Sequence, residues 1–292
     1  MKPHIGAVLL NWKEWPLTMT CLENLIDQEG IRLSIVLVDN QAETPPPVIR
    51  NGQVRVIANR ENRGFCEAVN QGLRALHEVR PQTYLLLNND CSFESERDLV
   101  RLFTHLENSP EVGAIAPQVV NPDTPNRLLH TWGHRRWLLA ADWLGRGSER
   151  EPDPKPEFVP MLNAACLLIR PEALERTGLW DEAYFIYYDD MDWTWRAHKA
   201  GWKLRYQPDI TLFHLGSYTM AKHVHFAEYC LSRGRVIFMR RHGEWWRWPA
   251  FLVGLGLTLL KPIAGASFTK AALRWRAYLE GLRMHLPPIP KF

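Results

Sequence analysis

The segment LSIVLVDN, at residues 33–40, is a short, largely apolar run that stops abruptly at Asp39 and Asn40. Three similar runs occur along the chain: IGAVLL at 5–10, VRVIA at 54–58 and YLLL at 84–87. Helical patterns of apolar residues lie between these runs, so strands and helices alternate. This alternation predicts βαβ crossovers and a mainly parallel sheet.

Polar side chains follow three of the predicted strands at the points where the strands end: Asn11, Asp39-Asn40 and Asn88-Asn89-Asp90. One such cluster alone would be ordinary turn chemistry, because Asn and Asp are common turn residues. Open parallel sheets, however, bind ligands beyond the carboxyl ends of their strands. Three clusters in succession therefore predict one shared binding site.

The composition of the 292 residues is that of a globular protein, with 46% apolar and 23% charged residues, which excludes wholesale disorder. Five scattered cysteines without a CxxC pair argue against a disulfide framework or a zinc ribbon and fit a reducing, cytoplasmic compartment. A nicotinamide-dependent oxidoreductase should show GxGxxG after the first strand, and residues 10–14, LNWKE, contain no glycine.

The middle of the chain, residues 121–160, is irregular and rich in proline, and we expect a long loop pair or flap there. Residues 164–169 then return to a strand pattern, and Arg170-Pro171-Glu172 opens a short helix.

The last segment, residues 231–292, carries 11 Lys or Arg and 2 Glu, a net charge of +9, while the first 230 residues carry 24 basic and 30 acidic side chains, a net charge of −6. Tryptophans and the apolar run PAFLVGLGLTLL at 249–260 lie among these positive charges. A bilayer span needs about 18 to 20 apolar residues, so this run is too short. The composition is that of an interfacial helix and predicts a membrane surface, not nucleic acid, as the partner. The alternative is a helical cap packed on the rest of the chain.

The segment GLWDEAYFIYYDDMDWTWRAHKAG, residues 178–201, is the richest in candidate functional side chains. Three carboxylates lie at a predicted helix start: Asp189, Asp190 and Asp192. They have a structural explanation, because carboxylates favour helix N-termini and Asp192 is spaced to pair with Arg196. The aromatic run at 184–188 favours a chemical one, because apolar surroundings raise a carboxyl pKa, as a general base requires. Successive helical residues point about 100° apart, so only one of the adjacent pair faces a reacting group.

Taken in order, these motifs resemble those of the family 2 glycosyltransferases, and in particular their rhamnosyltransferase-like branch. The matching motifs are Asp39-Asn40, Asn62-Arg63-Gly64-Phe65, Asn88-Asn89-Asp90 and Asp189-Asp190-Met191-Asp192-Trp193. Each motif is weak alone, but the ordered set is specific.

The resemblance implies the GT-A nucleotide-diphospho-sugar transferase fold, a mainly parallel, Rossmann-like α/β sheet flanked by helices, with a C-terminal helical extension. The catalytic domain would be residues 1–230, with a donor half at about 1–120 and an acceptor half at about 121–230. Residues 231–292 would form the basic, Trp-rich helical tail.

The implied reaction is inverting transfer of a sugar from a nucleotide-sugar donor. Asn11 and Asp39 would contact the base and ribose, and Arg63 and Gly64 would lie near the diphosphate. The complete implied donor site is Asn11, Asp39, Asn40, Arg63, Gly64, Phe65, Asn88 and Asn89.

The resemblance also implies a divalent metal, Mg²⁺ or Mn²⁺. Asp90 takes the place of the last Asp of the family's DxD motif, and His214 matches a position that often supplies a second ligand. A hard cation neutralises the charge that builds up on the leaving diphosphate. Asn88 stands where the motif has its first Asp, so we expect looser metal binding. A lone histidine after an apolar pair is otherwise more often structural.

Asp190 matches the second residue of the family's Glu-Asp pair, the catalytic base, and Asp189 stands in a supporting role where Glu is usual. We expect the acceptor to lie on residues whose flat rings stack on sugars. The predicted acceptor-binding set is Trp180, Asp181, Tyr187 and Tyr188, although tyrosines in such a passage can equally belong to the core.

The sequence thus predicts a cytoplasmic glycosyltransferase on the inner face of the cell membrane, acting in cell-surface polysaccharide biosynthesis. The expected donor is dTDP-L-rhamnose, and the expected acceptor is a saccharide, linked to a polyprenyl diphosphate. The alternatives are a UDP-hexose-dependent transferase of the same fold and a catalytically silent protein that binds sugar nucleotides or membranes.

Overall fold

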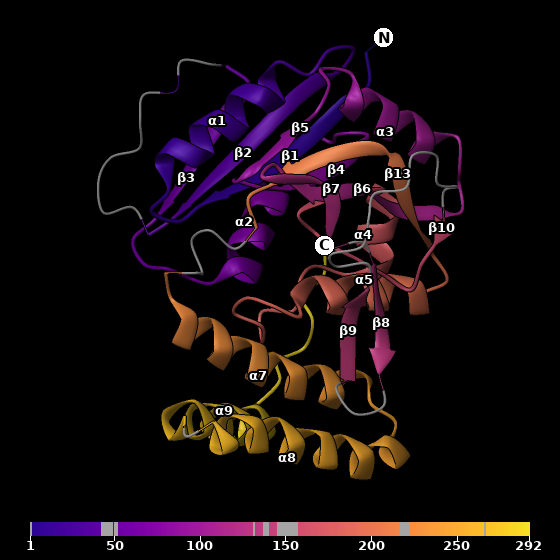
Figure 1. Ribbon diagram of the computed structural model, residues 1–292. Helices are drawn as coiled ribbons and strands as arrows, with labels where there is room; N and C mark the ends of the chain where they lie inside the picture. The colour runs from indigo at the N-terminus through magenta and orange to yellow at the C-terminus, as the bar shows by residue number, and fades with distance from the viewer. Residues whose placement is uncertain are drawn as a thin grey trace.

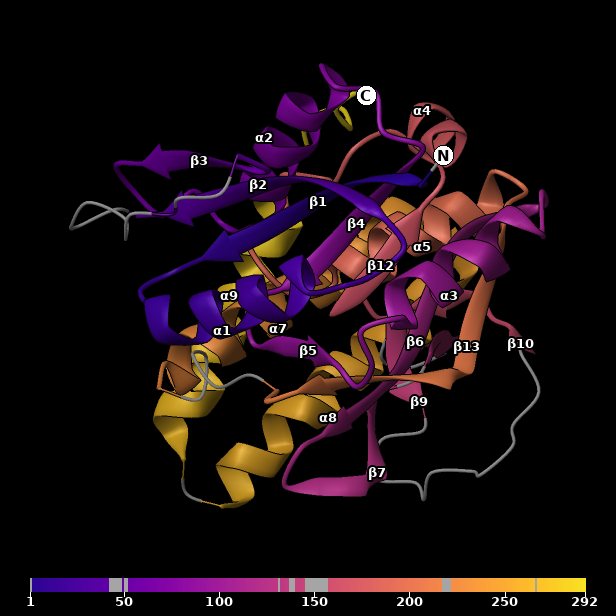
Figure 2. The same cartoon turned by 90° about the horizontal axis from the view of Figure 1, so that it is seen from above.

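The computed structural model describes residues 2–41, 49, 52–130, 132–136, 140–144, 157–216, 222–265 and 267–292. An α/β body with a central sheet lies above a layer of C-terminal helices (Figure 1). The sheet runs in the order β10-β13-β6-β12-β4-β1-β2-β3, with β5 and β7 attached at its side, as the view from above in Figure 2 shows.

The first half of the sheet is parallel, as the strand and helix alternation predicts. Strand β1 pairs in parallel with both β2 and β4, and β2 pairs in parallel with β3. The bounds are β1 His4–Asn11, α1 Trp15–Ile26, β2 Arg32–Asn40, β3 Val54–Asn59, α2 Phe65–His77 and β4 Thr83–Asn88.

The second half makes the sheet mixed. Strand β12 runs antiparallel to β4 and β6, whereas β13 runs parallel to β6. The short β5 pairs antiparallel with the end of β13. The bounds are β5 Cys91–Phe93, α3 Asp98–Glu107, β6 Val112–Asn121, β12 Cys166–Ile169, α4 Pro171–Thr177, α5 Asp189–Lys199 and β13 Lys203–His214.

The expectation of a loop pair at residues 121–160 is wrong for much of that range. Strand β7 extends the sheet by pairing with β6, and a small sheet forms in the order β11-β8-β9. Strand β7 forms a hairpin with β6, and β8 forms one with β9. They were missed because their sequences, TPNRLLH, WGHRR and AADWL, contain no continuous apolar run of the kind that marks the first strands. The bounds are β7 Thr124–His130, β8 Trp132–Arg136, β9 Ala140–Leu144, β10 Glu157–Phe158 and β11 Met161–Leu162. Residues 145–156 lie outside the described part of the chain.

Both faces of the central sheet are buried. Along β1, Val8 belongs to the core that α2, α5 and α7 cover, while Ala7 and Leu9 belong to the core that α1 and α3 cover. Because successive strand residues point to opposite faces, a strand covered on both sides reads as a continuous apolar run. This explains why IGAVLL shows no alternation with polar residues.

The C-terminal helices continue from the body. Helix α7 buries Val236, Ile237, Phe238 and Met239 in the same core as α5, and α9 lies along α7 and α8 (Figure 1). The residues after α9 return to the body, where the Leu179 amide donates to the Pro290 carbonyl at 2.9 Å. The bounds are α7 Val224–His242, η1 Trp245–Arg247, α8 Trp248–Ala264 and α9 Phe268–Arg283. Helix α7 therefore crosses residue 231, where a separate tail was expected to begin.

Among the described residues, no helix is both long enough and apolar enough to cross a bilayer. All five cysteines are free and buried.

Two helical glycines give a matched test of the packing between α2 and β1. A Cβ on Gly72 would lie 2.5 Å from a Val8 methyl carbon, whereas a Cβ on Gly256 in α8 meets nothing within 4 Å. We expect Gly72→Ala to lower the free energy of unfolding by about 1–3 kcal/mol through overpacking. Gly256→Ala should raise it by about 0.5–1 kcal/mol, because alanine is the better helix former. Urea denaturation of both variants measures this, and equal effects would contradict the packing described.

Candidate active site

A chain of hydrogen bonds joins the ends of the three predicted strands. The Asn11 amide donates to Asp39 Oδ1 at 2.8 Å, and the Thr18 hydroxyl donates to Asn11 Oδ1 at 2.8 Å. The Asn89 amide in turn donates to the Thr18 hydroxyl oxygen at 2.8 Å. The three polar clusters therefore meet at one edge of the sheet, which confirms that prediction from the sequence.

In this series of hydrogen bonds, Asp39 is the residue that can still accept a further one. Its side chain is buried, and burial raises its carboxyl pKa, although the bond from Asn11 opposes that shift. Its Oδ2 atom has no hydrogen-bond partner among the described residues, so it remains able to accept from a ligand hydroxyl or N–H group. Asn11 differs, because both ends of its amide are used within the protein. Within the protein Asn11 orients Asp39, and its direct contact with a nucleotide stays a prediction.

Asn40 organises the loop after β3. Its amide donates to Asn62 Oδ1 at 2.9 Å and to the Gly64 carbonyl at 3.0 Å, and its Oδ1 accepts from the Arg63 amide at 3.0 Å. Asn40 is thus a scaffold for the loop and not a free donor group. The Arg63 side chain is largely exposed and pairs with Glu67 at 2.7 Å.

The same loop touches the segment that precedes α5. The Phe65 amide donates to the Phe185 carbonyl at 2.6 Å. Gly64 has φ of 84°, and a Cβ there would lie 2.9 Å from the Phe185 carbonyl oxygen, so only glycine fits. The expected donor half and acceptor half are therefore in direct backbone contact.

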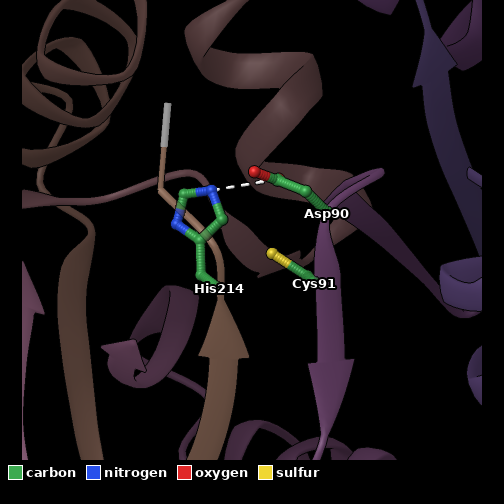
Figure 3. Close-up of side chains that lie close together, drawn as sticks. All are labelled: Asp90, Cys91 and His214. Carbon is green, nitrogen blue, oxygen red and sulfur yellow. Dashed lines mark ion pairs between the residues drawn. The ribbon is translucent and has the colours of Figure 1, made fainter. Parts of the chain in front are cut away.

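The candidate metal ligands come together where β5 pairs with the end of β13. Cys91 lies opposite His214 in the pairing, which brings Asp90 beside the imidazole. Asp90 Oδ1 and His214 Nε2 are 3.0 Å apart, with both side chains about one-tenth exposed (Figure 3). One ligand atom each from Asp90, Cys91 and His214 fits within 4.8 Å.

The donor chemistry of this cluster fits a hard or borderline divalent cation. Burial raises the pKa of the Cys91 thiol well above its ordinary value, and the Asp90 charge adds to that rise. The thiol donates to the Ala165 carbonyl at 3.6 Å, and burial favours its protonated form. A carboxylate oxygen and an imidazole nitrogen remain, and divalent cations such as Mn²⁺ accept both.

A strained turn places the carboxylates at the start of α5. Tyr187 and Tyr188 have φ of 67° and 65°, the left-handed region that residues with side chains avoid. Such strain persists only where surrounding structure imposes it, and it concentrates at functional sites. The turn makes Asp189 and Asp190 the first residues of the helix.

Burial perturbs the pKa values of both adjacent carboxyls. It raises the pKa of Asp189 well above its ordinary value, and the Asp190 charge adds to the rise. Burial raises the pKa of Asp190 to about 6, although backbone amides of Met191 and Ala164 oppose that shift. Burial thus favours the protonated form of both carboxyls, and Asp190 is the more exposed of the two.

Asp190 is connected to the metal cluster through one short loop. The Ala164 amide lies 3.5 Å from Asp190 Oδ2, and the next carbonyl, that of Ala165, accepts from the Asn88 amide at 2.9 Å. Asn88 ends β4, two residues before Asp90. The candidate base and the candidate metal ligands thus belong to one site.

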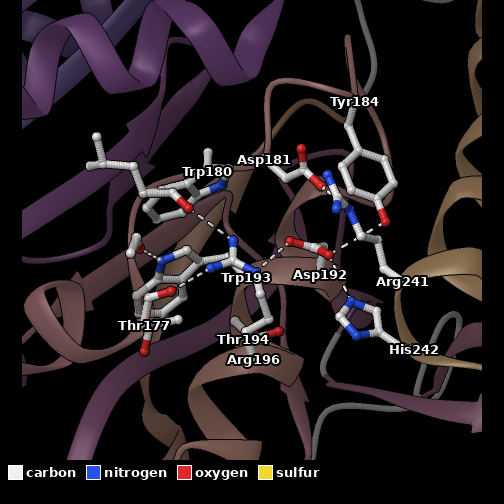
Figure 4. A network of polar contacts seen from close by, with 12 residues as sticks. Thr177, Trp180, Asp181, Tyr184, Asp192, Trp193, Thr194, Arg196, Arg241 and His242 are labelled. Carbon is white, nitrogen blue, oxygen red and sulfur yellow. Dashed lines mark hydrogen bonds and ion pairs between the residues drawn. The ribbon is translucent and has the colours of Figure 1, made fainter. Parts of the chain in front are cut away.

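The third carboxylate has a structural task. Asp192 is fully buried, with Oδ2 at 2.8 Å from Arg196 Nε and Oδ1 at 2.7 Å from His242 Nε2 (Figure 4). Burial alone would raise its pKa, but the Arg196 guanidinium and the His242 ring outweigh that effect and hold the pKa below its ordinary value. The predicted pair with Arg196 is confirmed. His242 was missed because it lies 50 residues away, beyond any local spacing signal.

Three of the four residues in the predicted acceptor set are buried. Trp180 is fully buried and stacks on Trp193, with ring centroids 4.9 Å apart, so it has no free face for a sugar. Asp181 is buried and pairs with Arg241 at 2.7 Å. Tyr188 is also buried, and only Tyr187 of the four is partly exposed.

The family model described as "Glycosyltransferase like family 2" matches residues 3–237. A curated relative, the N-acetylglucosaminyl-diphospho-decaprenol L-rhamnosyltransferase of Mycobacterium tuberculosis, is 27% identical over 248 residues, covering 74% of this chain and 78% of the relative. A low-salt glycan biosynthesis hexosyltransferase of Haloferax volcanii is 23% identical, covering 68% of this chain and 63% of the relative.

Solved glycosyltransferases share the fold. The mannosyltransferase PcManGT from Pyrobaculum calidifontis, in complex with GDP-Man and Mn²⁺, aligns with a TM-score of 0.56 at 17% identity, over 97% of this chain and 88% of that chain. GalNAc-T7 with UDP, GalNAc and Mn²⁺ aligns with a TM-score of 0.57 at 14% identity, over 82% of this chain and 48% of that chain, about half its length. The fold is therefore the GT-A glycosyltransferase fold, and the chain is a glycosyltransferase that belongs to family 2.

Proposed function

We propose that this protein is a metal-dependent, inverting glycosyltransferase in which Asp190 is the catalytic base and Asp90 and His214 hold the metal. One observation carries the proposal: a partly exposed carboxyl with a raised pKa lies one hydrogen-bonded loop away from a carboxylate and imidazole pair. Inverting transfer needs these two functions in separate groups, because one removes a proton while the other stabilises a leaving diphosphate.

The roles of the side chains follow from their protonation and contacts. Asp190, ionised at neutral pH, accepts the proton of the acceptor hydroxyl as that oxygen attacks the anomeric carbon. Asp189 keeps its proton, so a second negative charge does not repel the attacking oxygen. Asp90 and His214 would hold a divalent cation, which would supply positive charge for the diphosphate leaving group. Asp39 Oδ2 accepts from the nucleoside of the donor.

For the donor we propose dTDP-L-rhamnose and for the acceptor a polyprenyl-diphosphate-linked saccharide. The name of the Mycobacterium tuberculosis relative supports both, since it is a rhamnosyltransferase acting on N-acetylglucosaminyl-diphospho-decaprenol. Solved glycosyltransferases of this fold with UDP or GDP-Man keep a UDP-hexose donor as the alternative. Measurable sugar transfer from either donor would distinguish an enzyme from a catalytically silent binding protein.

Asp190→Asn tests the base. We expect kcat to fall by about 10² to 10⁴-fold, and the wild-type rate to rise with pH through about 6 as the carboxyl ionises. The free energy of unfolding should change with pH in the opposite direction to the rate. Because folding raises this pKa, the wild-type protein loses stability as the pH rises toward 6. Asp190→Asn should therefore be more stable than the wild type at pH 8.

Sugar transfer from dTDP-rhamnose to a lipid-linked acceptor, followed by mass spectrometry, measures the first effect, and thermal denaturation measures the second. The exposed Asp27→Asn is the control and should match the wild type. Full turnover in a folded Asp190→Asn protein would contradict the assignment.

Asp90→Ala tests the metal site without turnover. A nucleotide that binds only the native state raises the melting temperature. We expect Mn²⁺ to increase the shift given by dTDP in the wild-type protein, and not in Asp90→Ala or His214→Ala. The exposed Asp123→Ala should behave like the wild type. A metal-dependent shift that persists in Asp90→Ala would remove that residue from the metal site.

We also propose that the enzyme works as a peripheral protein on the cytoplasmic face of the membrane, docked through α8. Every exposed residue described in this helix is apolar or glycine: Pro249, Leu252, Val253, Gly256, Leu257, Leu260, Ile263 and Ala264. Trp245 and Phe268, which are 84% and 67% exposed, flank the helix. The net charge of +9 in residues 231–292 matches an anionic lipid surface.

Co-sedimentation of the full chain with phosphatidylglycerol vesicles tests this docking. Replacing Val253 and Leu257 by Asp puts two charges on the exposed apolar face, and we expect the bound fraction to fall at least tenfold with unchanged thermal stability. Val79→Asp is the matched control, because Val79 is an exposed apolar residue outside this face. Equal binding by the double variant and the control would contradict docking through α8.

A further inference from the structure

The last two residues of α7 hold two buried carboxylates that bracket the candidate base. Arg241 Nε lies 2.7 Å from Asp181 Oδ2, and His242 Nε2 lies 2.7 Å from Asp192 Oδ1. Figure 4 shows both side chains entering the network from α7. Neither Asp181 nor Asp192 has any exposed side-chain surface. Between these two anchors runs the segment 182–191, with the aromatic run and Asp190.

We propose that Arg241 and His242 are positioning residues for catalysis: they fix both ends of the segment 182–191 and so set the orientation of Asp190. The inference rests on the proposed function, because it assumes that Asp190 is the base. The end of α7 lies beyond residues 3–237, which match the family model. The proposal therefore adds residues outside that match to the active site.

The strained turn explains why two anchors are needed. Tyr187 and Tyr188 both occupy the left-handed region, so the segment does not hold this shape by its own preference. At the first anchor, Asp181 Oδ1 also accepts from the Ala183 amide at 3.0 Å. At the second, Asp192 accepts from the Tyr184 hydroxyl at 3.4 Å. Each ion pair therefore fixes the aromatic segment as well as its own carboxylate.

Arg241 also contacts the C-terminal residues, which connects its ion pair with Asp181 to the end of the chain. Its Nη2 donates to the Pro287 carbonyl at 2.5 Å, and the neighbouring Arg240 donates to the Gly281 carbonyl at 2.7 Å. The Leu179 amide, two residues before Asp181, donates to the Pro290 carbonyl. The C-terminal residues and α7 thus enclose the start of the segment from two sides.

The donor edge is held by other contacts. Asp39 is oriented through Asn11 and Thr18, and among the described residues no hydrogen bond or ion pair joins either of them to α7. A positioning role of Arg241 and His242 therefore predicts a loss in kcat with little change in donor affinity. A role limited to overall stability would predict losses in both, or in neither at a temperature where the variant is folded.

The experiment uses the full chain and four substitutions: Arg241→Ala, Arg241→Lys, His242→Ala and His242→Gln. For the alanine variants we expect kcat to fall tenfold to a hundredfold. The affinity for dTDP with Mn²⁺, measured by calorimetry, should stay within twofold of the wild type. His242→Gln should recover kcat to within about threefold, because its side-chain N–H can reach Asp192. The acid limb of the pH profile should move in His242→Ala and return in His242→Gln.

Two matched control variants test whether removing any surface arginine or histidine has the same effect as removing Arg241 or His242. Arg55 pairs with Glu78 at 3.0 Å, but both side chains are more than half exposed, so Arg55→Ala should leave kcat and the melting temperature unchanged. His285 is an exposed histidine of the same C-terminal region, and His285→Ala should also match the wild type.

The outcomes are distinguishable. Wild-type kcat in folded His242→Ala and Arg241→Ala proteins would overturn the positioning role, as would equal losses of kcat and donor affinity. If the alanine variants do not fold, the conservative variants decide, because Arg241→Lys keeps the charge but not both contacts of the guanidinium and should lower kcat alone. If the wild-type protein transfers no sugar, the proposed function fails. Hydrogen exchange of residues 182–191 then tests whether His242 fixes this segment. Faster exchange in His242→Ala than in Arg55→Ala supports that role, and equal exchange refutes it.

Discussion

The burial of three carboxylates at the start of α5 is the constraint on which the rest of the site depends. Buried charges are costly unless they are paired or neutralised. The surroundings of the three differ: burial raises the pKa of Asp189, Arg196 and His242 pair with Asp192, and Asp190 is partly exposed. In the proposed function, one helix turn therefore carries a neutral acid, a structural anion and a reactive carboxylate. The difference between them comes from their surroundings, because their chemistry is the same.

The same constraint explains why the two halves of the enzyme cannot act as independent parts. The loop after β3 bonds to the Phe185 carbonyl, and the loop at Ala164 and Ala165 bridges Asp190 to the end of β4. A shift of either half relative to the other would move the proposed base with respect to the proposed metal ligands. Helix α7 closes this arrangement from below the sheet (Figure 1). The C-terminal helices thus connect the proposed membrane-docking surface with the segment that carries the proposed base.

Local signals in the sequence were enough for the strands β1 to β4, the first helices and the meeting of the strand ends. Apolar runs and their polar stops are properties of neighbouring residues, and parallel pairing then fixes which ends meet. Contacts between distant residues carried no such signal. His242 lies 50 residues from its partner, Trp180 stacks on Trp193 in the core, and the Asn11 amide bonds to Asp39 and Thr18. In each case the residue type was noted or available, but its role depends on a packing partner that only the fold supplies.

The central claim is that the fold keeps Asp190 as a carboxyl with a raised pKa in a buried network. Titration of aspartate carboxyl carbons by ¹³C NMR, with the wild-type protein compared to Asp190→Asn, tests this claim most directly. The account predicts one resonance that titrates near pH 6 and is missing in the variant. A resonance of Asp190 that titrates at or below the ordinary aspartate value of about 4 would contradict it.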